Sequence, residues 1–152
     1  MYIATDTLIL IADGEKALFL RNEGDEKYLN LNVEQKKKQD NPPTRDQAAN
    51  RRGRMSDGNG TGHRSAVDDT DWHELAKDRF ASDLSNLLYK RAHKGDFDRL
   101  VIIADPATLG EIRSNLHKEV GDKVIGEIDK DLTNHPLDEI EKMLQQEMTE
   151  AA

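Results

Sequence analysis

Three carboxylates occur where a two-metal nuclease would need them. Asp13 follows an apolar run at residues 7–12, and Asp105 follows a second apolar run at residues 100–104. Glu74 lies at the start of an amphipathic segment. If the two runs are neighbouring parallel strands, their carboxyl ends meet at one edge of a sheet, where the helix also begins. Clustered carboxylates could hold two Mg²⁺ or Mn²⁺ ions there and activate water for phosphodiester cleavage.

Each of these carboxylates also has a structural role available to it. Asp13-Gly14 is a strong hairpin-turn signal. Asp105 precedes Pro106, the arrangement typical of a helix N-cap followed by proline at the first helical position. Glu74 can form a capping box with Asp71. These roles favour a protein with no catalytic residues and no cofactor, and the metal-dependent nuclease is kept as an alternative.

Other catalytic chemistries find little support in the residues. The five histidines are scattered and form no HExxH pair, which argues against a zinc site. There are no cysteines, so disulfides and thiolate metal sites are excluded. Ser65 and Ser82 have no nucleophile elbow around them.

One segment of the chain concentrates positive charge. Residues 36–64 hold eight basic and three acidic residues, a surplus of five, whereas the whole chain carries −8 and its remainder therefore −13. Such a segment favours a polyanionic partner. The predicted phosphate-binding residues are Lys36, Lys37, Lys38, Arg45, Arg51, Arg52, Arg54 and Arg64.

The same segment is rich in glycine. Gly60, Gly62 and His63 form its predicted tip, whose flexible backbone can approach phosphates closely and offer N–H donors. The segment lacks aromatic residues, which argues against base stacking. A solvated insertion without a ligand is the alternative interpretation.

Hydrophobic patterning predicts eight elements in the order β-β-β-α-β-α-β-α. Strands are expected at residues 7–12, 16–20, 28–33, 100–104 and 124–128. Helices are expected from Asp71 to Lys94, from Asp105-Pro106 onward and from Pro136 onward, and Gly95 should end the first. Residues 35–69 are predicted to form one long flexible basic loop, which is unusual inside a compact domain.

Right-handed crossovers and adjacent hairpin strands restrict how these elements combine. The predicted fold is α/β and ribonuclease-H-like: a five-stranded mixed sheet of order 3-2-1-4-5 with three helices. At 152 residues the chain is expected to form a single domain, residues 1–152. It shows no signal peptide and no apolar run of bilayer length, so we expect a cytoplasmic protein without membrane contact.

Three segments resemble the host attachment protein family, which is associated with bacterial attachment to host cells. They are residues 11–17, 104–113 and 127–136, so the resemblance runs through nearly the whole chain. It implies a role in attachment to host cells. Because no export signal is visible, that role would be indirect.

That family is similar in turn to the middle domain of archaeal and eukaryotic peptide chain release factors. In those domains a Gly-Gly-Gln loop followed by Ser-Ala promotes peptidyl-tRNA hydrolysis. The corresponding residues here are Gly62-His63-Arg64-Ser65-Ala66, so the glutamine and one glycine are missing. The resemblance implies a release-factor-like module that associates with ribosomes or structured RNA and lacks release chemistry. A protein-binding adaptor, using the acidic body as its contact surface, is a further alternative.

Overall fold

The computed structural model describes residues 2–39 and 62–151, with side chains for residues 2–39 and 75–148. Five strands form one sheet in the order β3-β2-β1-β4-β5. β1 pairs antiparallel with β2 and parallel with β4, and β5 is parallel to β4. The predicted mixed sheet and its order are therefore confirmed. The strands are β1 (Leu8–Ala12), β2 (Lys16–Asn22), β3 (Leu31–Lys38), β4 (Leu100–Ala104) and β5 (Val124–Asp129).

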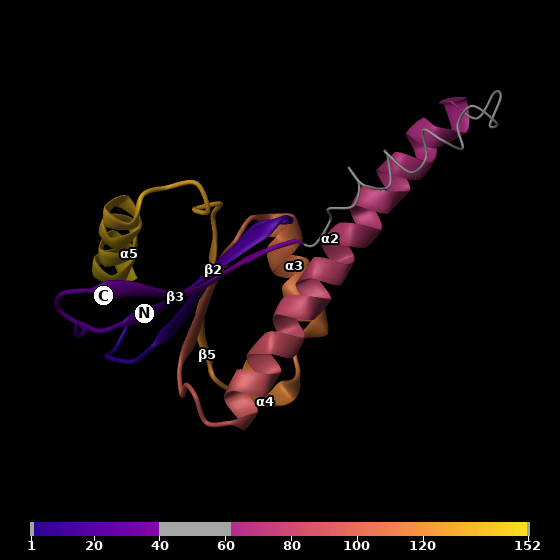
Figure 1. Ribbon diagram of the computed structural model, residues 1–152. Coiled ribbons are helices and arrows are strands. Elements are labelled where there is room, and N and C mark those ends of the chain that lie inside the picture. The colour runs from indigo at the N-terminus through magenta and orange to yellow at the C-terminus, as the bar shows by residue number, and fades with distance from the viewer. Residues whose placement is uncertain (1, 40–61, 152) are drawn as a thin grey trace.

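Helices cover both faces of this sheet. Figure 1 shows α2, α3 and α4 on one side and α5 on the other. The described part of the chain has four helices where three were predicted, because a single-turn helix follows α3. The helices are α2 (Gly62–His93), α3 (Pro106–Asn115), α4 (Lys118–Gly121) and α5 (Leu137–Ala151).

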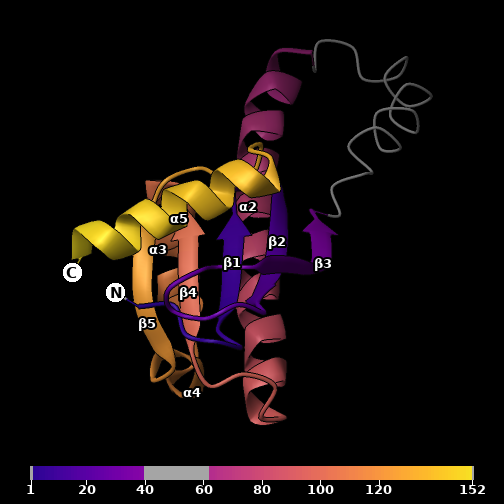
Figure 2. The same ribbon diagram turned by 90° about the vertical axis from the view of Figure 1, so that its left-hand side faces the viewer.

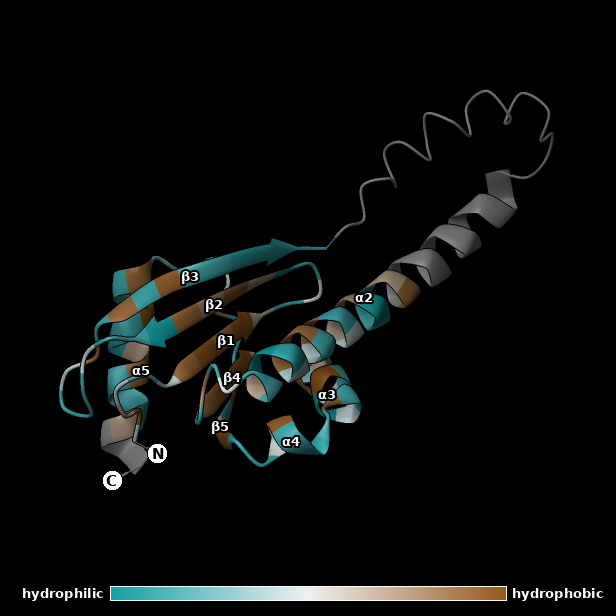
Figure 3. Ribbon diagram, turned by 60° about the horizontal axis from the view of Figure 1, so that its bottom comes forward, coloured by the Kyte–Doolittle hydropathy of each residue, from teal (hydrophilic) through white to brown (hydrophobic). Residues whose placement is uncertain are grey.

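The two central strands are apolar throughout because both their faces are covered. All five residues of β1 and all five of β4 are buried. Leu8 and Leu10 face α2 and α3, whereas Ile9 and Ile11 face α5. Strands buried on both sides read as continuous apolar runs rather than as alternation. Figure 3 shows this contrast between the apolar centre of the sheet and the hydrophilic β3.

The third strand is shifted from its predicted position. It was expected at residues 28–33, but Tyr28 is 74% exposed and lies in a turn. The carboxylate of Asp25 accepts hydrogen bonds from the backbone N–H groups of Lys27 and Tyr28 and thereby forms that turn. The strand then begins at Leu31 and continues to Lys38 at the sheet edge, where lysines discourage pairing with another chain.

The bounds 35–69 predicted for the basic loop were wrong at both ends, because β3 ends later and the first helix begins earlier than predicted. Residues 35–38 pair with β2, and α2 begins at Gly62. Asp71 is therefore inside the helix, and its predicted capping box is wrong. Helix extension is favourable once a stable nucleus exists, and the buried positions from Ala76 to Ala92 provide it. The predicted flexibility falls mainly on residues 40–61, which lie outside the described residues.

α2 also extends beyond the sheet. Its 32 residues span about 48 Å at 1.5 Å each, far longer than a five-residue strand. Figure 2 shows its amino-terminal turns rising past the edge at which β1, β3 and β4 end. Gly95, with φ of 74°, ends the helix as predicted, and the N–H of Asp96 donates to the carbonyl of Arg91. Among the described helices, none combines the length and the apolarity that crossing a bilayer requires.

Candidate functional site

Three described chain segments converge at the end of the sheet where β1, β3, β4 and β5 end. The turn after β1 carries Asp13, α3 begins after Asp105, and the segment after β5 runs from Lys130 to the start of α5 at Leu137. Strands β1, β3, β4 and β5 run in the same direction, so all four carboxyl ends lie on one side of the sheet. In open α/β sheets, ligands commonly bind outside these ends.

The turn after β1 is linked directly to the segment after β5. One oxygen of Asp13, Oδ1, accepts from the backbone N–H groups of Glu15 and Lys16 at 2.7 and 2.8 Å. Its other oxygen lies 2.8 Å from the hydroxyl of Thr133, which also lies 2.7 Å from Asp131. The ammonium group of Lys16 hydrogen-bonds the side chain of Asn134. These contacts hold residues 13–16 against residues 131–134, about 120 positions apart in the sequence.

The three carboxylates of the nuclease alternative have different positions in the structure. Asp13 forms the turn just described, and both its oxygens have partners. Asp105 is the N-cap of α3 and accepts from the N–H of Thr108 at 3.2 Å, as its position before Pro106 predicted. Glu74 lies on α2, but its side chain is outside the described residues. Within the described side chains, no group of three or more histidines and carboxylates is placed to hold a metal ion.

The predicted phosphate-binding residues fall into two groups. Lys36, Lys37 and Lys38 lie on β3 rather than in a loop. Gly62, His63 and Arg64 form the first turn of α2, where only the backbone is described. The others, Gly60, Arg45, Arg51, Arg52 and Arg54, lie outside the described residues.

Lysines converge on a cavity of about 360 Å³ between β2, β3 and the start of α5. Its polar lining includes Lys16, Lys36, Lys38 and His135. Its apolar lining includes Ala17, Leu18, Val33, Leu137 and Ile140. The lysines of β3 were expected from the local charge, but Lys16 and His135 were not, because only the sheet register and α5 bring them to the same place.

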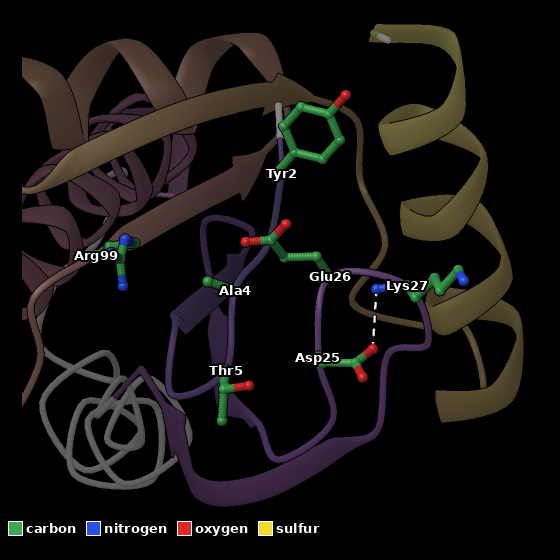
Figure 4. A pocket seen from close by; sticks show the side chains of 7 residues that line it. All are labelled: Tyr2, Ala4, Thr5, Asp25, Glu26, Lys27 and Arg99. Carbon is green, nitrogen blue, oxygen red and sulfur yellow. Dashed lines mark hydrogen bonds between the residues drawn. The ribbon is translucent and has the colours of Figure 1, made fainter.

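A second cavity, of about 640 Å³, lies at the opposite end of the strands, where β1 and β4 begin and β2 ends. Figure 4 shows its lining from the amino-terminal segment, the β2–β3 turn and Arg99. Acidic and basic residues balance here: Asp25 and Glu26 stand against Lys27 and Arg99. The Asp25 carboxylate is already engaged in its turn, and the backbone N–H groups of Tyr28 and Lys27 lower its pKa. This cavity therefore has no charge preference.

A network of two arginines and two carboxylates joins β2, β3 and the end of α2. Arg21 contacts Glu34 at 3.2 Å and Asp96 at 3.0 Å. Arg91 contacts Glu34 at 2.6 Å and Asp96 at 2.7 Å. Burial opposes ionisation of Glu34, but hydrogen bonds from Arg21 and Arg91 outweigh it and lower the pKa of Glu34. Nothing in the sequence signals this network, because its members are up to 75 positions apart.

Replacing Glu34 by Gln should destabilise the protein by about 1–2 kcal/mol, because Arg21 and Arg91 would then share one carboxylate, that of Asp96, instead of two. Urea unfolding at pH 7 measures the loss. A lowered carboxylate pKa gives stability that is present above the unfolded pKa and is lost as the pH falls through the folded pKa. The free energy of unfolding of the wild-type protein should therefore fall by this contribution below about pH 4, and that of the variant should fall less over the same range. An identical decrease in both proteins would contradict the assignment.

The family model of bacterial archaeo-eukaryotic release factor family 12 matches residues 6–144. The match includes all five strands, α2, α3, α4 and the start of α5. No curated protein matches the chain.

Proposed function

Because this chain belongs to bacterial archaeo-eukaryotic release factor family 12, we propose that it is a release-factor-like module that associates with ribosomes or structured RNA. The family match across residues 6–144 is the observation that carries the proposal. It supports the resemblance to release-factor domains that the sequence predicted. The cytoplasm, where ribosomes are found, would be its place of action.

We propose that the module is not an enzyme. Release-factor domains depend on a glutamine that this chain lacks in its matching stretch, Gly62-His63-Arg64-Ser65-Ala66. The engagement of Asp13 and Asp105 in a turn and a helix cap also supports a non-catalytic role. The nuclease alternative, and its Mg²⁺ or Mn²⁺ ions, remain predictions that depend on the carboxylate of Glu74.

The positive charge of residues 36–64 is the proposed contact with RNA. Phosphate recognition needs only charge and donors, and it requires no aromatic residues. The acidic remainder of the chain would be repelled by RNA, so it would orient the basic segment toward the ribosome. Any effect on attachment to host cells, as the host attachment family resemblance implies, would then follow indirectly from action on RNA or ribosomes.

Cosedimentation with purified ribosomes tests this proposal. Binding should be clear at about 50 mM salt and should fall steeply by about 200 mM, because phosphate contacts release condensed counterions. An equal concentration of an acidic protein of similar size serves as the control for trapping in the pellet. If the protein neither cosediments with ribosomes nor binds structured RNA at about 50 mM salt, the proposal is refuted.

A further inference from the structure

In the cavity between β2, β3 and α5, called here the lysine cavity, three lysines project from the same face of the sheet. Lys16 is opposite Lys38 in the register of β2 and β3, and Leu18 is opposite Lys36. Residues opposite each other, and residues two apart on a strand, project to the same face. Leu18 packs on the core beneath α5. The side chains of Lys16, Lys36 and Lys38 therefore all project to the α5 side of the sheet.

This arrangement places like charges side by side. Residues directly opposite each other in an antiparallel pair have Cβ atoms about 4.5–5.5 Å apart, and like charges there are destabilising. Lys16 and Lys38 are such a pair. No carboxylate is among the residues that line the cavity. In the described part of the chain, none of the ion pairs involves Lys16, Lys36 or Lys38.

The two carboxylates that contact Thr133, in the cavity wall, form no ion pair with the lysines. Asp13 and Asp131 are directed at Thr133 and at backbone N–H groups. Lys16 hydrogen-bonds Asn134, which is uncharged. Asp138, in the first turn of α5, is exposed and does not line the cavity. Among residues 2–39 and 75–148, the three ammonium groups thus form a local charge of +3 with no ion-paired counterion.

A further polar group in the cavity wall lacks a partner. The Nδ1 atom of His135 is buried and makes no hydrogen bond to any described residue. A buried polar atom left without a partner costs about 1–3 kcal/mol. A ligand could become that partner only after the imidazole ring turns toward the cavity. Helix α5, which begins two residues later, adds the positive end of its dipole.

Apart from Lys37 and Thr133, the rest of the lining is aliphatic. Leu18, Val33, Leu137 and Ile140 form an apolar wall beside the lysines. The volume of about 360 Å³ is within the range of small-molecule sites, about 300–1,000 Å³. The cavity therefore combines a site for a compact anion of high charge with a site for an uncharged, apolar body.

We propose that this cavity binds a nucleotide with two or more phosphates. A diphosphate group carries about three negative charges at neutral pH, which the three lysines would balance, and the nucleoside would lie against the aliphatic wall. The nucleotide could be free or could be the 5′ end of an RNA strand, since the chemistry is shared. The site does not depend on association with ribosomes, so it goes beyond the function proposed above.

Titration calorimetry of the full chain with ADP at about 0.15 M salt tests the site, and inorganic pyrophosphate is the second probe. We expect saturable binding of one ADP per chain, at least fivefold tighter than pyrophosphate because of the aliphatic wall. The double variant Lys36→Gln, Lys38→Gln should bind ADP at least tenfold more weakly. Its thermal unfolding should match the wild type or rise slightly, because the replacements remove like-charge repulsion.

Lys90→Gln is the matched control. Lys90 is exposed on α2, which covers the other face of the sheet from α5, and it does not line the cavity. We expect less than a twofold change in ADP affinity. A loss as large as that of the double variant would indicate a diffuse field and overturn the proposal, as would absence of saturable ADP binding or equal affinities for ADP and pyrophosphate.

A competition experiment separates the two sources of the nucleotide. A 5′-diphosphorylated octauridylate that displaces ADP supports the end of an RNA strand, and one that leaves ADP in place supports the free nucleotide. A variant with Arg51, Arg52 and Arg54 replaced by Glu should keep its ADP affinity. Ribosome association can thus fail while ADP binding survives, and the two proposals are tested separately.

Discussion

Replacing Arg51, Arg52 and Arg54 by Glu is expected to weaken binding to ribosomes or structured RNA by roughly two orders of magnitude at about 0.1 M salt. Each arginine that contacts a phosphate releases counterions, so the wild-type affinity falls steeply with salt. Reversing three charges removes three such contacts and adds repulsion. The slope of log affinity against log salt should therefore decrease by about three. Filter binding over a salt series measures both quantities.

The control for this variant carries the same change of net charge elsewhere. Lys90, Lys94 and Lys118 are exposed lysines on α2, at its end and on α4, and their replacement by Glu should reduce the affinity much less. His63→Ala asks whether the glycine-rich tip occupies a specific site, since a mechanism based on charge alone predicts almost no effect. If the arginine replacements leave binding unchanged, the basic segment is not the contact, and the adaptor that uses the acidic body becomes the first hypothesis.

Replacing Phe80 by Ala is expected to destabilise the protein by about 3–5 kcal/mol. Phe80 is 2% exposed and lies in the core where α2 crosses the sheet, together with Leu10 and Phe19. Its removal forfeits the burial of an aromatic ring and leaves a cavity that rigid strands cannot close. A domain of this size has a total stability of about 5–15 kcal/mol, so the loss is a large fraction of it. Urea unfolding followed by circular dichroism measures the change.

Leu75→Ala is the matched control for Phe80. Leu75 lies five residues earlier on the same helix and is 57% exposed. We expect a change within about 0.5 kcal/mol. If the two replacements had equal effects, the packing of α2 against the sheet would differ from the structure described above.

The order of the sheet was predictable because topology restricts it strongly. The apolar runs of β1 and β4 are five residues long in the structure and buried on both faces, which is what a continuous apolar run indicates. Once these two runs were assigned as strands, right-handed crossover connections and the two hairpins allowed few strand orders in the sheet. Local signals at single residues were also reliable, since Gly95 ends α2 and Asp105 caps α3.

The ends of elements were less predictable, because they depend on packing. The amino-terminal turns of α2 show no apolar periodicity of their own, and helix formation spreads from the packed turns after Ala76. Residues 36–38 are polar and show no alternation, yet they pair with β2. An edge strand needs only backbone hydrogen bonds and one partner, so its pattern is weak.

The sequence by itself determined the class of fold, the strand order, the chemical types available at the candidate sites and the resemblance to release-factor domains. These follow from short-range patterns, because burial on two faces and capping depend on neighbouring residues. Only the tertiary structure decided which side chains meet. Asp13 with Thr133, Arg21 with Asp96, and Lys16 with Lys38 and His135 come together through the sheet register and the placement of α5. Contacts between residues so far apart in the chain leave no local pattern, so the lysine cavity and the ion-pair network could not be predicted from the sequence.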